Sequence, residues 1–171
     1  KQKVYSKGLM TAIVKCMLRK GNPHDVQVLQ VSEGCISSGT EYLLQIPNPK
    51  VTVALCTVEA LGNDWVLFAY DAEMNSAWAF QKTVTDKSGT EAAQLAFNSF
   101  HGTHPIFAKR KSNPKLLSRA LMCVESSSIS VLAILEDILV TGHIPSSVPL
   151  LNDRQYEEVF HKLVGHLLFC T

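Results

Sequence analysis

The chain has 171 residues, of which 46% are hydrophobic and 18% charged, and its formal net charge is +1. This length suits one ordinary hydrophobic core, and no long low-complexity run interrupts it, so we expect a single soluble globular domain over residues 1–171. Neither an apolar run of about 18 residues nor a secretory leader is visible, which predicts no membrane span and a cytoplasmic or nuclear protein.

The small net charge conceals an uneven distribution of charged side chains. Residues 1–24 carry six Lys and Arg and no acid, and residues 108–124 carry five Lys and Arg and no acid. The rest of the chain holds five basic and fifteen acidic side chains. If the fold brings the two acid-free stretches together, their summed potential favours a polyanionic partner.

Residues 1–24 are predicted to form a basic amphipathic helix. Apolar side chains recur with helical spacing over residues 7–20, at Met10, Ile13, Val14, Met17 and Leu18. Gly21 and Pro23 then end the pattern. The polar side of this helix contains only basic charges.

Residues 25–104 are predicted to form a sheet with one covering helix. Five segments have β patterning, at residues 26–31, 42–46, 51–58, 65–70 and 77–84. The connections between them are too short for crossover helices, which predicts an antiparallel meander. A capping box at Ser88 and Glu91 then predicts a helix that ends near Gly102.

Residues 105–171 are predicted to form a helical block. Pro114 suits the first turn of a helix through Val124, residues 126–128 cap a helix over 129–141, and Asn152 or Asp153 begins the last helix. The fold class is therefore α+β, with an N-terminal helix, a five-stranded antiparallel meander and about four C-terminal helices. A meander followed by a helix resembles the order in pleckstrin-homology-like domains, which implies a bent antiparallel sheet plugged at one end by that helix.

No motif of a known catalytic or metal site occurs, so we expect no cofactor, no metal and no catalytic residue with a local signature. Five cysteines lie far apart and are expected to be buried, reduced thiols of an intracellular protein. The adjacent acids Glu136 and Asp137 are interpreted as the outer side of a buried helix. An enzyme remains an alternative if residues converge only in three dimensions, and its candidates are His101, His104, Cys123 and Glu125.

The acid-free stretches carry the strongest functional signal. Lys and Arg beside the backbone amides of a helix N-terminus suit phosphate oxygens, so we predict an anion-binding set of Lys15, Arg19, Lys20, Lys109, Arg110, Lys111, Lys115 and Arg119. Nucleic acid is the first polyanion to consider, and an acidic peptide or a phospholipid headgroup is the next. The alternative is a protein adaptor or structural subunit, in which the apolar C-terminal helices contact another chain or a second copy.

Overall fold

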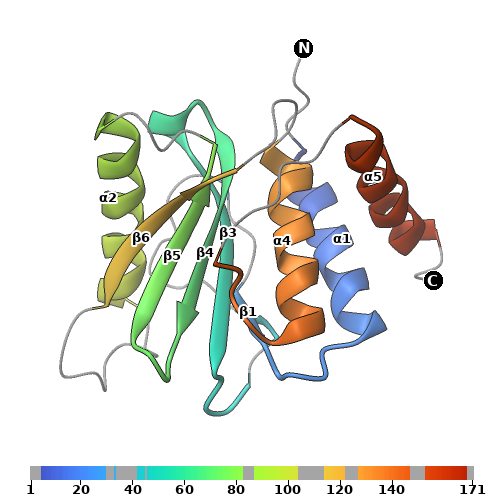
Figure 1. The fold of residues 1–171 in the computed structure, drawn as a ribbon, viewed down its shortest axis with the longest axis horizontal. Helices are drawn as coiled ribbons and strands as arrows, with labels where there is room; N and C mark the ends of the chain where they lie inside the picture. Colours follow the sequence, from blue (N-terminus) through green and yellow to red (C-terminus); the bar gives the residue numbers. More distant parts are fainter. Residues whose placement is uncertain are drawn as a thin grey trace.

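The computed structural model describes residues 5–29, 33, 42–44, 46–82, 87–103, 114–121, 127–146 and 153–168. These residues form an α+β fold, as the sequence predicts. The sheet is mixed, and Figure 1 shows helices on both sides of it. No helix in these ranges combines the length and the apolar character that a membrane crossing requires.

The sheet has six strands in the order β2-β1-β3-β4-β5-β6. The strands are β1 (Gln27–Leu29), β2 (Tyr42–Leu44), β3 (Val51–Val58), β4 (Asp64–Asp71), β5 (Ser76–Gln81) and β6 (Lys115–Ala120). All five predicted strands are present. A short 3-10 helix, η1 (Glu59–Leu61), and the left-handed residues Gly62 and Asn63 form the turn that connects β3 to β4.

The prediction of an antiparallel meander is wrong, because β1 pairs in parallel with β3 and separates β3 from β2. The Gln27 side chain holds this arrangement together. Its Oε1 accepts a hydrogen bond from Ile46 N at 3.1 Å, and its Nε2 lies 3.4 Å from Thr52 Oγ1. The strand β1 lies between β2 and β3, where a hairpin would have paired them directly. The buried side-chain amide of Gln27 in β1 forms hydrogen bonds with Ile46, which follows β2, and with Thr52 in β3. The pleckstrin-homology-like arrangement is not confirmed.

The predicted helix from Pro114 to Val124 is also wrong, because residues 115–120 form strand β6 in parallel with β5. The helix α2 (Lys87–Thr103) between β5 and β6 is the crossover that a parallel pair requires. Pro114 therefore precedes a strand, where its missing N–H costs no ladder hydrogen bond. The block that was predicted as purely helical contributes an edge to the sheet.

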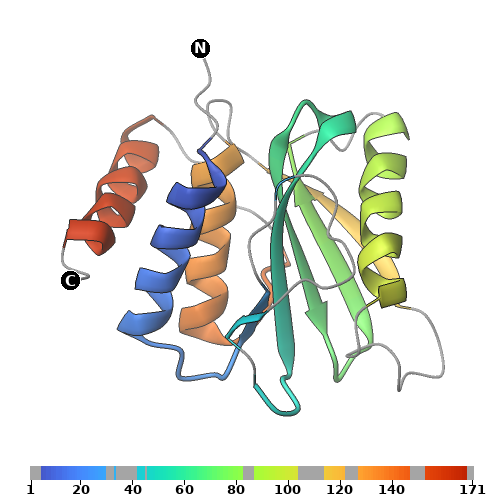
Figure 2. The same ribbon diagram turned by 180° about the vertical axis from the view of Figure 1, so that it is seen from behind.

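The other predicted helices are confirmed. They are α1 (Lys7–Lys20), α4 (Ser127–Thr141) and α5 (Asp153–Leu168). Ser6 caps α1 by accepting a hydrogen bond from Leu9 N at 3.2 Å. Figures 1 and 2 show α2 on one face of the sheet, α4 and α1 on the other, and α5 outside them.

Each face of the sheet has its own hydrophobic core. Aliphatic and aromatic side chains of α1, α4 and the sheet form one cluster, which includes Met10, Val53, Trp65, Leu67, Phe80 and Leu132. The cluster under α2 is rich in small residues, with Ala54, Ala77, Ala79, Ala93 and Ala96 around Phe68 and Phe97. The small residues let α2 approach the strands closely.

Polar contacts join the N-terminal ends of α1 and α4 to β4. Trp65 Nε1 donates to Tyr5 O at 2.8 Å, and Trp65 N donates to Ser127 Oγ at 3.0 Å. Tyr5 N donates to Ser128 Oγ at 2.9 Å, across 123 residues of sequence. Burial raises the pKa of the Tyr5 phenol.

A further contact, between His24 and Val140, holds the C-terminal end of α4. His24 Nε2 lies 3.0 Å from Val140 O, and because a carbonyl only accepts hydrogen bonds, the contact places the imidazole proton on Nε2. Gly142 ends α4 with φ +73°, and a Cβ built on it would lie 2.6 Å from His24 Cγ. Glycine is required here both for the left-handed backbone and for the space that the imidazole ring fills.

Candidate nucleic-acid interface

The C-terminal half of α1 carries three of the predicted anion-binding residues. Lys15 and Arg19 lie opposite the apolar side chains that face the core, Lys20 is the last residue of the helix, and all three are exposed to solvent. We call these three residues the α1 basic face. Arg19 and Lys20 lie in the last turn, where positive charge also complements the helix dipole.

The helix next to the α1 basic face supplies acidic groups. Helix α5 packs on α1 and α4, and its exposed side chains include Glu157 and Glu158. Arg154 Nε lies 3.3 Å from Glu158 Oε1 within α5, and Lys162 of α5 pairs with Glu136 of α4. The positive potential of α1 is therefore bounded by a helix of mixed charge.

Strand β6 carries the other two predicted residues that the structure describes. Lys115 pairs in register with Ser76, and Arg119 with Phe80. Side chains alternate along a strand, and Leu121 packs in the core under α4, so Arg119 lies on that same face of the sheet. Arg119 is partly exposed, although its Nε is buried and has no hydrogen-bond partner among the described residues.

An aromatic residue on the neighbouring strand β5 lies close to Arg119. Trp78 is partly exposed, pairs in register with Leu117, and lies on the face of the sheet that α4 covers. It is a diagonal neighbour of Arg119 across the β5–β6 pair. The pairing of a cation with an indole on adjacent strands could not be read from sequence, because residues 115–120 were interpreted as a helix.

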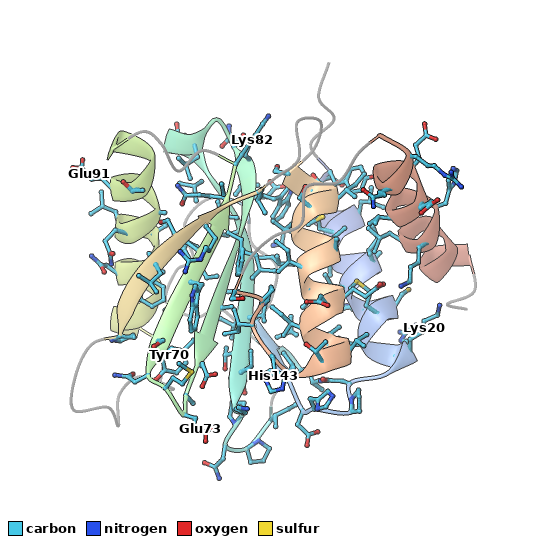
Figure 3. The ribbon with its side chains drawn as sticks, viewed as in Figure 1. Lys20, Tyr70, Glu73, Lys82, Glu91 and His143 are labelled. Carbon is cyan, nitrogen blue, oxygen red and sulfur yellow. The ribbon has the colours of Figure 1, made fainter. Side chains whose placement is uncertain are left out.

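The structure does not bring the α1 basic face and β6 together. Figures 1 and 2 show α4 between α1 and the strands β5 and β6 in both views. Figure 3 places Lys20 on the side of the molecule opposite α2, which packs against β6. Lys109, Arg110 and Lys111 lie outside the described residues. The single positive face that the sequence suggested is thus represented by two separate surfaces.

The residues considered for catalysis give no assembled site in the described ranges. No group of three or more potential metal ligands occurs in these ranges. His104, Cys123 and Glu125 lie outside them, and His101 is in the last turn of α2 with its side chain not described. Cys16 and Cys56 are buried, as predicted.

The acidic pair of α4 has a structural role. Glu136 forms an ion pair with Lys162, and Asp137 is exposed on the outer side of the helix. Both positions agree with the interpretation of the pair as the outer arc of a buried helix.

The apolar surface of α4 is used within the chain. Ten of its residues are buried, and they pack between the sheet, α1 and α5. Val140 is the exposed large apolar side chain of this helix, with 66% of its surface accessible. The apolar side chains of α4 therefore belong to the core of this chain.

Comparison with known protein families and with curated proteins finds no match to this chain.

Proposed function

We propose that the chain is a non-catalytic binding module for a polyanion, nucleic acid first. The observation that carries the proposal is the α1 basic face, three exposed cations within six residues of a helix that contains no acid. Such a group of cations contacts phosphate groups without reading bases, because it recognises charge and not base edges. Binding should therefore show little sequence preference.

The β6 surface supports a second contact. Arg119 and Trp78 lie on adjacent strands of one sheet face, and a guanidinium beside an indole suits a phosphate next to a base. The α1 basic face and the β6 surface are separated by α4, so a nucleic acid that touches both must pass around the helical layer. Lys109, Arg110 and Lys111 precede β6 in the sequence and lie outside the described residues, so the test treats them as a separate set.

Salt dependence tests the proposal. Each neutralised phosphate contributes roughly 0.7 to 0.9 to the slope of log K against log salt, so replacing three contacting cations lowers that slope by about two to three units. We would measure fluorescence anisotropy of labelled single- and double-stranded oligonucleotides at three salt concentrations. The two test variants replace Lys15, Arg19 and Lys20, or Lys109, Arg110 and Lys111, by Ser.

A matched control removes the same charge elsewhere. Lys50, Arg154 and Lys162 are exposed and ion-paired with Glu73, Glu158 and Glu136, so their triple replacement by Ser also lowers the net charge by three. We expect this control to change the slope by less than about one unit. An absence of binding at the lowest salt, or equal losses in the test and control variants, overturns the proposal.

We also propose a cytoplasmic or nuclear location. The support for it is that Cys16 and Cys56 are buried and form no disulfide bond within the part of the chain that the structure describes, which suits a reducing compartment. Maintenance of all five thiols in the native protein, measured by thiol alkylation and mass spectrometry, is the expected result.

A further inference from the structure

Strand β6 is the last strand of the sheet, and among the described residues it pairs only with β5. It is six residues long, and the described side chains from Leu116 to Ala120 are all partly exposed. An edge strand of this length presents a row of backbone donors and acceptors that an added strand can use. The opposite edge, β2, has three residues.

The hydrogen bonds between β5 and the end of β6 identify which backbone groups face the open edge. Leu121 N donates to Gln81 O at 2.7 Å, so the N–H and C=O of Leu121 point toward β5. In a parallel pair both groups of one residue point to the same side and the sides alternate along the strand. The groups of Leu117 and Arg119 therefore also face β5, and those of Leu116, Ser118 and Ala120 face outward.

The charge around this edge indicates which kind of segment could pair with β6. The sequence contains no acid between Glu91 and Glu125, which covers most of α2 and all of β6. A second copy of β6 would bring Lys115 and Arg119 against the same cations, and like charges across adjacent strands are destabilising. An extended segment rich in Asp or Glu would instead find opposite charges in register positions of β6.

We propose that β6 binds an extended acidic segment of a partner protein by strand addition, with main-chain hydrogen bonds from Leu116, Ser118 and Ala120. Helix α2 packs against β6 and would flank the added strand on one face of the sheet. Arg119 lies on the other face and supplies charge there. This mode obtains affinity from the backbone and specificity from alternate side chains of the guest.

Hydrogen exchange tests the geometry first. In the free protein, the amides of Leu116, Ser118 and Ala120 are expected to exchange more than about tenfold faster than those of Leu117 and Arg119, as measured by NMR. Equal protection of both sets would mean that another part of the chain pairs with the edge, and it would overturn the proposal.

A peptide of four Glu-Val repeats, labelled with fluorescein, is the binding probe. It is expected to bind the parent chain and to slow exchange at the three outward amides. A fully N-methylated version of the peptide keeps the charge and loses the backbone donors, so it should bind at least about tenfold more weakly. A Lys-Val peptide of the same length is expected not to bind, and equal binding of it would exclude the charge argument.

Ser118→Pro removes one outward N–H without touching the pairing with β5, a position where edge strands accept proline. It should weaken binding of the Glu-Val peptide about tenfold or more, with the far-UV circular dichroism unchanged. Arg119→Glu should weaken it by a similar factor. If Ser118→Pro fails to fold, the N-methylated peptide still decides the role of the backbone.

Arg119 takes part in both proposals, and Ser118→Pro separates strand addition from nucleic-acid binding. Ser118→Pro retains every cation, so its salt-dependent affinity for an oligonucleotide should equal that of the parent chain. Loss of both ligands in Ser118→Pro would show a damaged fold, and unchanged peptide binding would overturn strand addition. A concentration-dependent dimer in sedimentation velocity that Ser118→Pro abolishes would identify a second copy as the occupant and would also overturn it.

Discussion

The two faces of the sheet are built differently. The face under α1 and α4 is packed with branched and aromatic side chains, and hydrogen bonds from Trp65 tie it to Tyr5 and Ser127, which come from distant parts of the chain. The face under α2 is packed with alanines around the Phe68–Phe97 pair. The first face joins segments that are remote in sequence, and the second is closed by a crossover helix that follows its own strand. The free energy of unfolding should therefore depend on long-range contacts at the first face and on the packing of α2 at the second.

The largest effects are expected from truncation at the centre of each core. Leu132 on the α4 face is 0% exposed and Phe97 on the α2 face is 2% exposed, so Leu132→Ala and Phe97→Ala should each cost about 2–5 kcal/mol of unfolding free energy. Urea denaturation followed by circular dichroism and tryptophan fluorescence measures both losses. Because the two cores share the strands between them, one common transition is expected. Two separate transitions would show that the faces unfold independently.

The next largest effect is expected at the C-terminal end of α4. Gly142→Ala meets both a φ of +73° and the His24 ring, whereas Gly62→Ala meets the same φ with nothing within 4 Å. We expect a cost of about 1 kcal/mol for Gly62→Ala and about 2–3 kcal/mol for Gly142→Ala. Thermal denaturation provides the comparison. Equal costs would show that the His24 contact contributes nothing to the α4 face.

A smaller effect is expected from the polar tie of the α4 face. Ser127→Ala removes the acceptor of the Trp65 amide and leaves that buried N–H without its side-chain partner, which should cost about 1–3 kcal/mol. The exposed Ser146 is a matched control, and Ser146→Ala should change the unfolding free energy by less than about 0.5 kcal/mol. Identical urea midpoints for the two variants would argue against the tie.

The smallest effect is expected outside both cores. Lys111→Ala replaces a residue of the second acid-free stretch and should change stability by less than about 0.5 kcal/mol, as surface substitutions generally do. Urea denaturation under the same conditions measures it. A loss comparable to that of Leu132→Ala would mean that this segment belongs to a core that the two clusters do not contain.

The sequence predicted α1 correctly and β6 incorrectly for one physical reason. The α1 segment is fourteen residues long, with a cap at Ser6 and apolar side chains at helical spacing, so its local signals agree. The six residues of β6 contain Lys, Leu, Arg and Ala, which favour helices, and Pro114 suits the start of a helix or a strand. Pairing with β5 overrides this local preference for a helix. No local sequence pattern indicates that β5 is the partner strand.

The candidate site was likewise predictable from the sequence only in part. Sequence alone determined that Lys15 and Arg19 would lie on the exposed side of a helix, because apolar spacing fixes which side is buried. The sequence also predicted the strands β1 to β5 and the helices α2, α4 and α5.

Only the tertiary structure decided that β1 lies between β2 and β3, that β6 forms the edge of the sheet, and that α4 separates the α1 basic face from Arg119. Hydrophobic periodicity reports which side of an element is buried. The choice of neighbouring elements is made by contacts between residues far apart in the chain, such as Gln27 with Thr52 and Tyr5 with Ser128, and these appear only when the chain has folded.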